Sequence, residues 1–127
     1  MGRKNEKWGW ENEMLEEMMK QLESLCAIPI RYLTYGGKEE KYAVYYTYSI
    51  EDADFVNDTP TTNIIYGCVT LFAPDMLRKN GILVKKHMKD LGFENIKIQK
   101  EDYDDEQEVF MLPINIEIKE VINQWLQ

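Results

Sequence analysis

Carboxylates are the main material for chemistry in this sequence. They gather in two stretches, IEDADFVNDTPTTN at residues 50–63 and EDYDDE at residues 101–106. Clustered carboxylates can bind Ca²⁺ or Mg²⁺, and paired ones can act as general acid and base. The first question is therefore whether either stretch has the spacing that such chemistry needs.

Neither stretch has the spacing of a calcium-binding loop. A loop begun at Asp52 has Asn57 where the turn glycine belongs and Asn63 where the closing glutamate belongs. A loop begun at Asp102 also lacks both residues. We therefore expect solvated loop carboxylates, with a weak and fortuitous Ca²⁺ or Mg²⁺ site as the alternative.

Other chemical groups are few and isolated. The lone histidine, His87, lies between lysines on a predicted helix, which is typical of a solvated surface residue. Cys26 and Cys68 are far apart and form no CxxC pair, so we expect two reduced thiols. The glycines fit no phosphate-binding spacing. The sequence thus predicts no catalytic residue, no metal site and no cofactor.

Composition limits the function classes further. A chain of 127 residues suits one domain, and its formal charge of −8 argues against a general nucleic-acid or membrane-surface binder. No apolar run approaches the length of a membrane span, and the first residues lack the apolar core of a secretory signal. Eight tyrosines, many in RYLTY and YAVYYTY, favour cross-strand packing or a subunit interface over base stacking.

The periodicity of apolar residues predicts two helices and about five strands. The second helix has a core stripe of Leu77, Val84, Met88 and Leu91, and apolar residues alternate along the last strand at Phe110, Leu112, Ile114, Ile116 and Ile118. The expected order is helix 12–25, strands 28–35, 41–49 and 62–73, a helix from Pro74 to Gly92, and strands 93–100 and 108–119. The pair Gly36-Gly37 followed by KEEK predicts a hairpin between the first two strands, and EDYDDEQ predicts the last hairpin turn. This gives an α+β fold with a mostly antiparallel or mixed sheet, two helices packed on one face, and the order α-β-β-β-α-β-β.

Around this single domain, at 12–118, we expect an irregular arm at 1–11 and an extension at 119–127 that could form a short amphipathic helix. Gly67 indicates a bulge or a close approach by a helix, and Gly81 indicates a tight crossing of helix and sheet. Pro113 indicates an edge or a bulge in the last strand.

Several of these segments together resemble a known family. CAIPI before a tyrosine-rich strand, TTNIIYGCVTLFAPD leading into a helix, and KDLGFENIKI leading into a strand resemble the small tail-completion, or tail-terminator, proteins of long-tailed bacteriophages and prophages. The resemblance covers about residues 14–119, and its motifs are structural. The N-terminal arm and the VINQWL tail depart from the family pattern.

The resemblance implies a non-enzymatic α/β sandwich that assembles as a ring, typically a hexamer. Such a ring caps the tail tube in the virion and joins it to head and neck proteins, after synthesis in the bacterial cytoplasm. DNA passes through the ring without specific binding, and acidic loops would repel it. The candidate assembly or lumen residues are Glu51, Asp52, Asp54, Phe55 and Asp58 in the first acidic loop, and Glu101, Asp102, Asp104 and Asp105 in the second.

Other interpretations stay open on the sequence alone. A head-completion or adaptor protein of the phage neck is the closest alternative. An acidic DNA mimic that inhibits a host nucleic-acid-binding protein is a second, although 15 Lys and Arg dilute its charge. A small-molecule-binding or enzymatic α+β domain is a third, and it would require a pocket with perturbed titratable groups.

Overall fold

The computed structural model describes residues 3–75 and 77–121, with side chains from Glu13 onward. Within them the elements are α1 (Arg3–Cys26), β1 (Ile30–Tyr32), β2 (Tyr42–Val56), β3 (Thr59–Ala73), α2 (Arg78–Leu91), β4 (Glu94–Ile98), β5 (Asp102–Asp104) and β6 (Val109–Val121). The predicted α+β class is confirmed, and the short strand β5 adds one element to the expected order.

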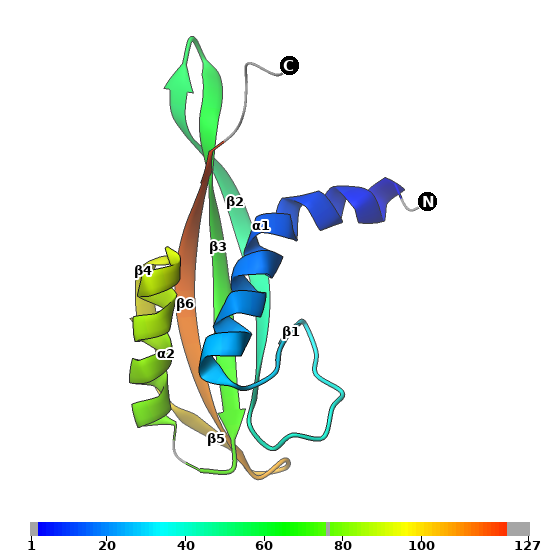
Figure 1. Ribbon diagram of the computed structural model, residues 1–127, viewed down its shortest axis with the longest axis vertical. Coiled ribbons are helices and arrows are strands. Elements are labelled where there is room, and N and C mark those ends of the chain that lie inside the picture. Colours follow the sequence, from blue (N-terminus) through cyan, green and yellow to red (C-terminus); the bar gives the residue numbers. More distant parts are fainter. Residues whose placement is uncertain (1–2, 76, 122–127) are drawn as a thin grey trace.

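The sheet is mixed, and both helices cover the same face of it (Figure 1). Its strand order is β1-β2-β3-β6-β4, and β5 pairs with a further part of β6. Strands β2, β3 and β6 are antiparallel neighbours, whereas β1 runs parallel to β2. The long strands β2, β3 and β6 therefore form the frame on which every other element packs.

The core lies between the helices and the inner face of these strands. Register pairs place Ala43, Leu71 and Leu112 in one buried row, and Tyr45, Val69 and Ile114 in the next. The helices contribute the buried side chains Leu15, Met19 and Leu22 from α1, and Val84 and Met88 from α2. The alternating pattern of the last strand is confirmed, since Leu112, Ile114, Ile116 and Ile118 are all buried.

The hairpin expected at Gly36-Gly37 is wrong. Strand β1 pairs in parallel with β2, with Ile30 opposite Ala43, so the chain between them loops back instead of turning tightly. The end of α1 fixes this arrangement: a Glu23 carboxylate oxygen accepts hydrogen bonds from the Ile30 N–H at 2.9 Å and from the Arg31 guanidinium at 2.6 Å. Tertiary contacts to α1 thus override the local turn signal.

The two ends of the domain also differ from expectation. Helix α1 already begins at Arg3, so the predicted irregular arm at 1–11 is helical from that residue. At the other end β6 continues to Val121, so residues 119–121 of the predicted extension are strand. The remainder of the expected amphipathic helix, 122–127, lies outside the described residues.

Gly67 lies at a bulge and Gly81 at a tight crossing of helix and sheet, as predicted, whereas the close approach at Gly67 is made by a neighbouring strand and not by a helix. Gly67 lies opposite Thr47, at a register shift between Thr47 and Ser49, and a Cβ there would lie 2.8 Å from the Tyr46 carbonyl oxygen. Gly81 lies where α2 crosses the sheet, and a Cβ there would collide with the buried Leu112 side chain. Both sites lack room for a side chain because backbone or core atoms already fill the space.

Pro113 lies at an interruption in the sheet. Its carbonyl oxygen accepts a hydrogen bond from the Gln99 N–H at 2.8 Å, just after β4 ends at Ile98 and before β5 begins at Asp102. In antiparallel pairing the nitrogen of a residue faces the same side as its carbonyl, so the missing N–H of Pro113 faces this gap. Pro113 therefore lies at a gap between β4 and β5 on one side of an interior strand, and not at the predicted edge or bulge.

Candidate functional site

The first acidic stretch forms a β-hairpin that projects beyond the helix-covered part of the sheet (Figure 1). The predicted loop is therefore wrong: β2 continues to Val56, and β3 begins at Thr59. Asn57 and Asp58 alone form the turn, with φ angles of 53° and 66°. Positive φ at both central residues is the geometry of a type I′ hairpin turn, and Asn and Asp tolerate it well. An Asn-Asp pair between a Phe-Val and a Thr-rich run was the sequence signal for this hairpin.

Asp54 anchors this hairpin to β6. Its carboxylate accepts a hydrogen bond from the Thr62 hydroxyl at 2.9 Å and pairs with the Lys119 ammonium at 3.2 Å. The hydrogen bond from Thr62, together with the charge of Lys119, holds the pKa of the Asp54 carboxyl below its usual value. The Thr61 hydroxyl also donates to the Asp54 backbone carbonyl at 2.6 Å. Asp54 is thus a structural carboxylate.

Glu51 is held in a similar way on the sheet face turned away from the helices. Its carboxylate accepts a hydrogen bond from the Tyr66 hydroxyl at 3.1 Å, which raises the pKa of Tyr66. Tyr48 lies beside Tyr66, with ring centroids 6.4 Å apart. This part of the sheet is therefore a surface of tyrosines and carboxylates.

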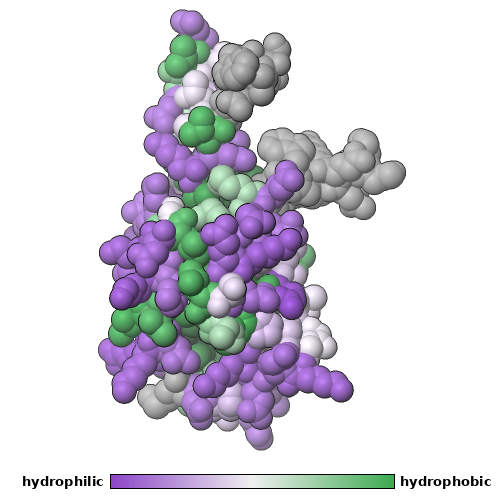
Figure 2. All heavy atoms as spheres, viewed as in Figure 1, coloured by the Kyte–Doolittle hydropathy of each residue, from purple (hydrophilic) through white to green (hydrophobic). Residues whose placement is uncertain are grey.

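The hairpin tip, residues 52–58, combines exposed apolar and acidic side chains. Phe55 and Val56 are 58% and 59% exposed, and Asp52 and Asp58 are exposed on either side of them. Figure 2 shows the same mixture of hydrophobic and hydrophilic atoms on the projecting hairpin. Adjacent apolar side chains held in water at the end of an arm are typical of a contact surface.

The second acidic stretch is structural and lies at the other end of the frame. The Glu101 carboxylate accepts a hydrogen bond from the Leu77 N–H at 2.7 Å and so caps the start of α2. Asp102 and Asp104 accept backbone N–H groups of their own turn, and Asp105 is exposed. Strand β5 pairs with the beginning of β6, whereas the hairpin pairs with its end. The fold therefore separates the two predicted acidic groups instead of bringing them together.

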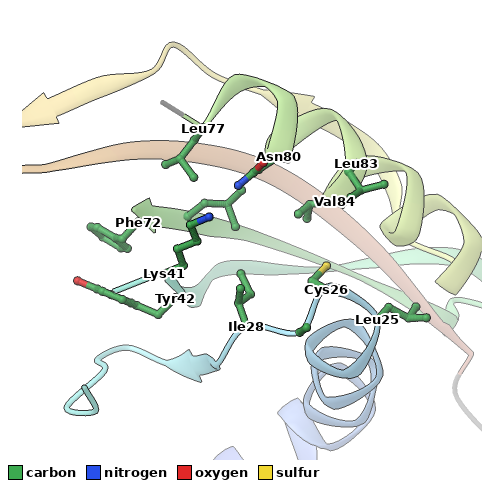
Figure 3. Close-up of a pocket in the computed structure, with 12 residues that line it drawn as sticks. Leu25, Cys26, Ile28, Lys41, Tyr42, Phe72, Leu77, Asn80, Leu83 and Val84 are labelled. Carbon is green, nitrogen blue, oxygen red and sulfur yellow. The ribbon is translucent and has the colours of Figure 1, made fainter. Parts of the chain in front are cut away.

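An apolar cleft of about 320 Å³ opens between the end of α1 and α2 (Figure 3). Leu25, Cys26 and Ile28 face Leu77, Leu83 and Val84 across it, with Lys41 and Asn80 as polar neighbours. Burial raises the pKa of the Cys26 thiol to about 11, which keeps it protonated and unreactive at neutral pH. Both cysteines are free. No sequence pattern indicated this cleft, because exposed and buried leucines cannot be told apart in the sequence.

Within the part of the chain that the structure describes, no cluster of His, Cys, Asp and Glu could hold a metal ion. Over the same residues, no helix has the length and hydropathy needed to cross a membrane. Comparison of the sequence with protein-family models and with curated proteins finds no match. Interpretation of the site therefore rests on its geometry.

Proposed function

We propose that this protein is a non-enzymatic structural subunit of a phage or prophage tail, a tail terminator or tail-completion protein. It assembles with copies of itself into a ring at the head-proximal end of the tail tube, and the resemblance implies that this ring is a hexamer. The observation that carries the proposal is the projecting β2–β3 hairpin with its exposed Phe55 and Val56.

The arrangement of the carboxylates supports assembly over catalysis. Asp54, Glu51 and Glu101 each accept a hydrogen bond that fixes a hairpin, a sheet face or a helix end. A general acid or base instead needs a substrate within hydrogen-bond reach, usually in a cleft. The cleft beside α2 is lined mainly by aliphatic side chains. Contact surfaces, rather than reactive groups, are thus the prominent features of the molecule.

Net charge supports the same proposal. The chain carries 23 Asp and Glu against 15 Lys and Arg. A ring through which DNA leaves the virion must not retain it, and like charge on the wall opposes adhesion of a polyanion. Each copy of the chain carries this excess of carboxylates, so an assembled ring carries it as well.

Shortening the hairpin tests the proposal. Replacing residues 53–62 by Asn-Gly joins the register partners Asp52 and Asn63 through a type I′ turn and leaves the buried rows intact. We expect the wild-type protein to form rings with a central pore, visible by negative-stain electron microscopy and measured by light scattering after size exclusion. We expect the shortened variant to stay folded and monomeric. A wild-type protein that shows no association at millimolar concentration or after chemical cross-linking would contradict the proposal.

A further inference from the structure

Helix α2 presents an exposed ridge that pairs two lysines with two aliphatic side chains. Lys79, Ile82, Leu83 and Lys86 are spaced i, i+3, i+4 and i+7, so they share one face of the helix, here called the α2 ridge. Ile82 and Leu83 are 63% and 55% exposed. In the space-filling view, hydrophobic atoms bordered by hydrophilic ones lie over α2 (Figure 2). Nothing within the described chain covers this ridge.

The α2 ridge and the hairpin tip have opposite charge. Helix α2 carries five basic side chains and one acidic one, although the whole chain has a net charge of −8. The stretch from 50 to 63 carries four acidic side chains and no basic one. Helix α2 thus carries five of the 15 Lys and Arg of the protein, and the stretch from 50 to 63 carries four of its 23 Asp and Glu.

The α2 ridge and the hairpin tip also have similar lengths. Lys79 and Lys86 are separated by about 10 Å along the helix, from a rise of 1.5 Å per residue. Asp52 and Val56, next to the turn that holds Asp58, are separated by about 13 Å along β2, from a rise of about 3.3 Å per residue. In both surfaces two adjacent apolar residues lie between the charged ones.

The two surfaces of one molecule do not meet. Gly81 of α2 lies against Leu112, whereas the hairpin extends beyond the pairing of Thr62 with Val121. Nine residues of β6 separate Leu112 from Val121, which corresponds to about 30 Å along the strand. Figure 1 shows the hairpin pointing away from the helices. A contact between them therefore requires a second copy of the chain.

We propose that the hairpin tip of one copy docks on the α2 ridge of a second copy. Val56 packs against Ile82 and Leu83, while Asp52 and Asp58 approach the two ridge lysines; the Phe55 side chain points to the opposite face of β2 from Val56. The apolar cleft bordered by Leu83 and the half-exposed Leu25 lies beside this contact. This inference rests on the proposed self-assembly and names the surfaces that carry it. Because the two surfaces differ, the contact is head-to-tail and generates a ring wherever the rotation closes.

Pairing of open strand edges explains assembly less well. The part of β2 beyond its pairing with β1 carries Glu51, Asp52 and Asp54, and the end of β6 beyond its pairing with β4 carries Glu120. Such edges repel one another, which is how natural sheets protect open edges. DNA also fits the ridge poorly, since Ile82 and Leu83 separate its lysines and cannot contact phosphates.

Reciprocal charge reversal tests the contact. One variant carries Asp52→Lys and Asp58→Lys, and the other carries Lys79→Glu and Lys86→Glu. Each alone places like charges across the contact, so we expect self-association to weaken about tenfold or more. In a 1:1 mixture every tip meets a ridge of opposite charge, and association should return. Sedimentation velocity of each variant and of the mixture measures this, and thermal melting confirms that each is folded.

A matched control is Lys97→Glu with Lys100→Glu, which makes the same change in net charge at exposed positions around the end of β4. It should associate like the wild type. If the wild type associates and ridge reversal has no effect, or the mixture is not rescued, the docking inference is wrong while the proposed function stands. If the wild type does not associate at all, both are wrong. If ridge reversal weakened binding of the protein to DNA and left its self-association unchanged, nucleic acid would be the ligand of the ridge and the inference would be wrong.

Site-directed cross-linking gives an independent measurement. In a Cys26→Ser background, Val56→Cys on one copy and Leu83→Cys on another should form a disulfide-linked dimer under mild oxidation. Leu33→Cys, equally exposed but on the loop after β1, is the matched control and should not. Equal yields from the two pairs would overturn the inference.

Discussion

The same three strands have two different environments along their length. Near Leu71 and Leu112 they are covered by both helices, and their inner residues are buried. Near Ala53 and Val121 they project as a hairpin and a strand end, and their apolar side chains are exposed. The covered half stabilises the fold by burial, whereas the projecting half is held by hydrogen bonds and by contacts such as the Asp54–Lys119 ion pair, and it leaves Phe55 and Val56 available for contacts.

Paired truncations in the two halves should give the largest contrast. Ile114→Ala removes a fully buried side chain, and we expect the free energy of unfolding to fall by about 2–5 kcal/mol. Phe55→Ala removes an exposed ring, and we expect a change within about 0.5 kcal/mol. Urea unfolding of the dilute protein, followed by circular dichroism, measures both. Similar losses from the two changes would show that the hairpin packs on the body.

The bulge at Gly67 lies within the covered half, and a methyl group there should disturb the pairing of β2 and β3. A Cβ would lie 2.8 Å from the Tyr46 carbonyl oxygen, which belongs to the backbone and cannot rotate away. We expect Gly67→Ala to lower the free energy of unfolding by about 1–3 kcal/mol. Gly36→Ala, with no heavy atom within 4 Å of its Cβ, is the control and should be nearly neutral. Thermal and urea unfolding compare the two.

The smallest effect concerns the anchor of the hairpin. Asp54 has a lowered pKa in the folded state, so its contribution to stability is present above its unfolded value of about 3.9 and is lost as the pH falls through the folded value. Thr62→Val removes the hydroxyl that is the main cause of the lowered pKa of Asp54, and we expect the pKa of the Asp54 carboxyl to rise toward its usual value. Thr61→Val is the control, because its hydroxyl contacts only the Asp54 backbone carbonyl. NMR titration of the Asp54 carboxyl measures its pKa in both variants. Equal changes in the two would contradict the role of the Thr62 hydroxyl.

Patterns that depend on burial could be predicted from the sequence. Alternation identified the inner residues of β6, and helical spacing identified Val84 and Met88. Gly92 was predicted to end α2, and it does so with a φ of 104° that glycine adopts without strain. These positions are fixed by local periodicity and by backbone geometry.

Features set by distant contacts could not be predicted. The parallel pairing of β1 depends on Glu23 of α1, and the capping role of Glu101 depends on Leu77, 24 residues away. The exposed Ile82 and Leu83 are chemically the same as the core residues beside them, so the α2 ridge has no separate sequence signal. The hairpin was missed for another reason, because its acidic composition hid an Asn-Asp turn.

The bulge beside Gly67 also has a mechanical consequence. Nine residues of β3, about 30 Å of strand, separate Gly67 from the turn at Asp58, and the part beyond the pairing of Thr62 with Val121 forms the projecting hairpin. Bulges concentrate bend and twist at one place in a strand pair, so this one sets the direction in which the strands run toward the tip. A rotation of about 10° there would move the tip by about 5 Å, roughly the distance between neighbouring strands. Small adjustments at a single residue pair can therefore set the radius and pitch of any assembly that the arm joins.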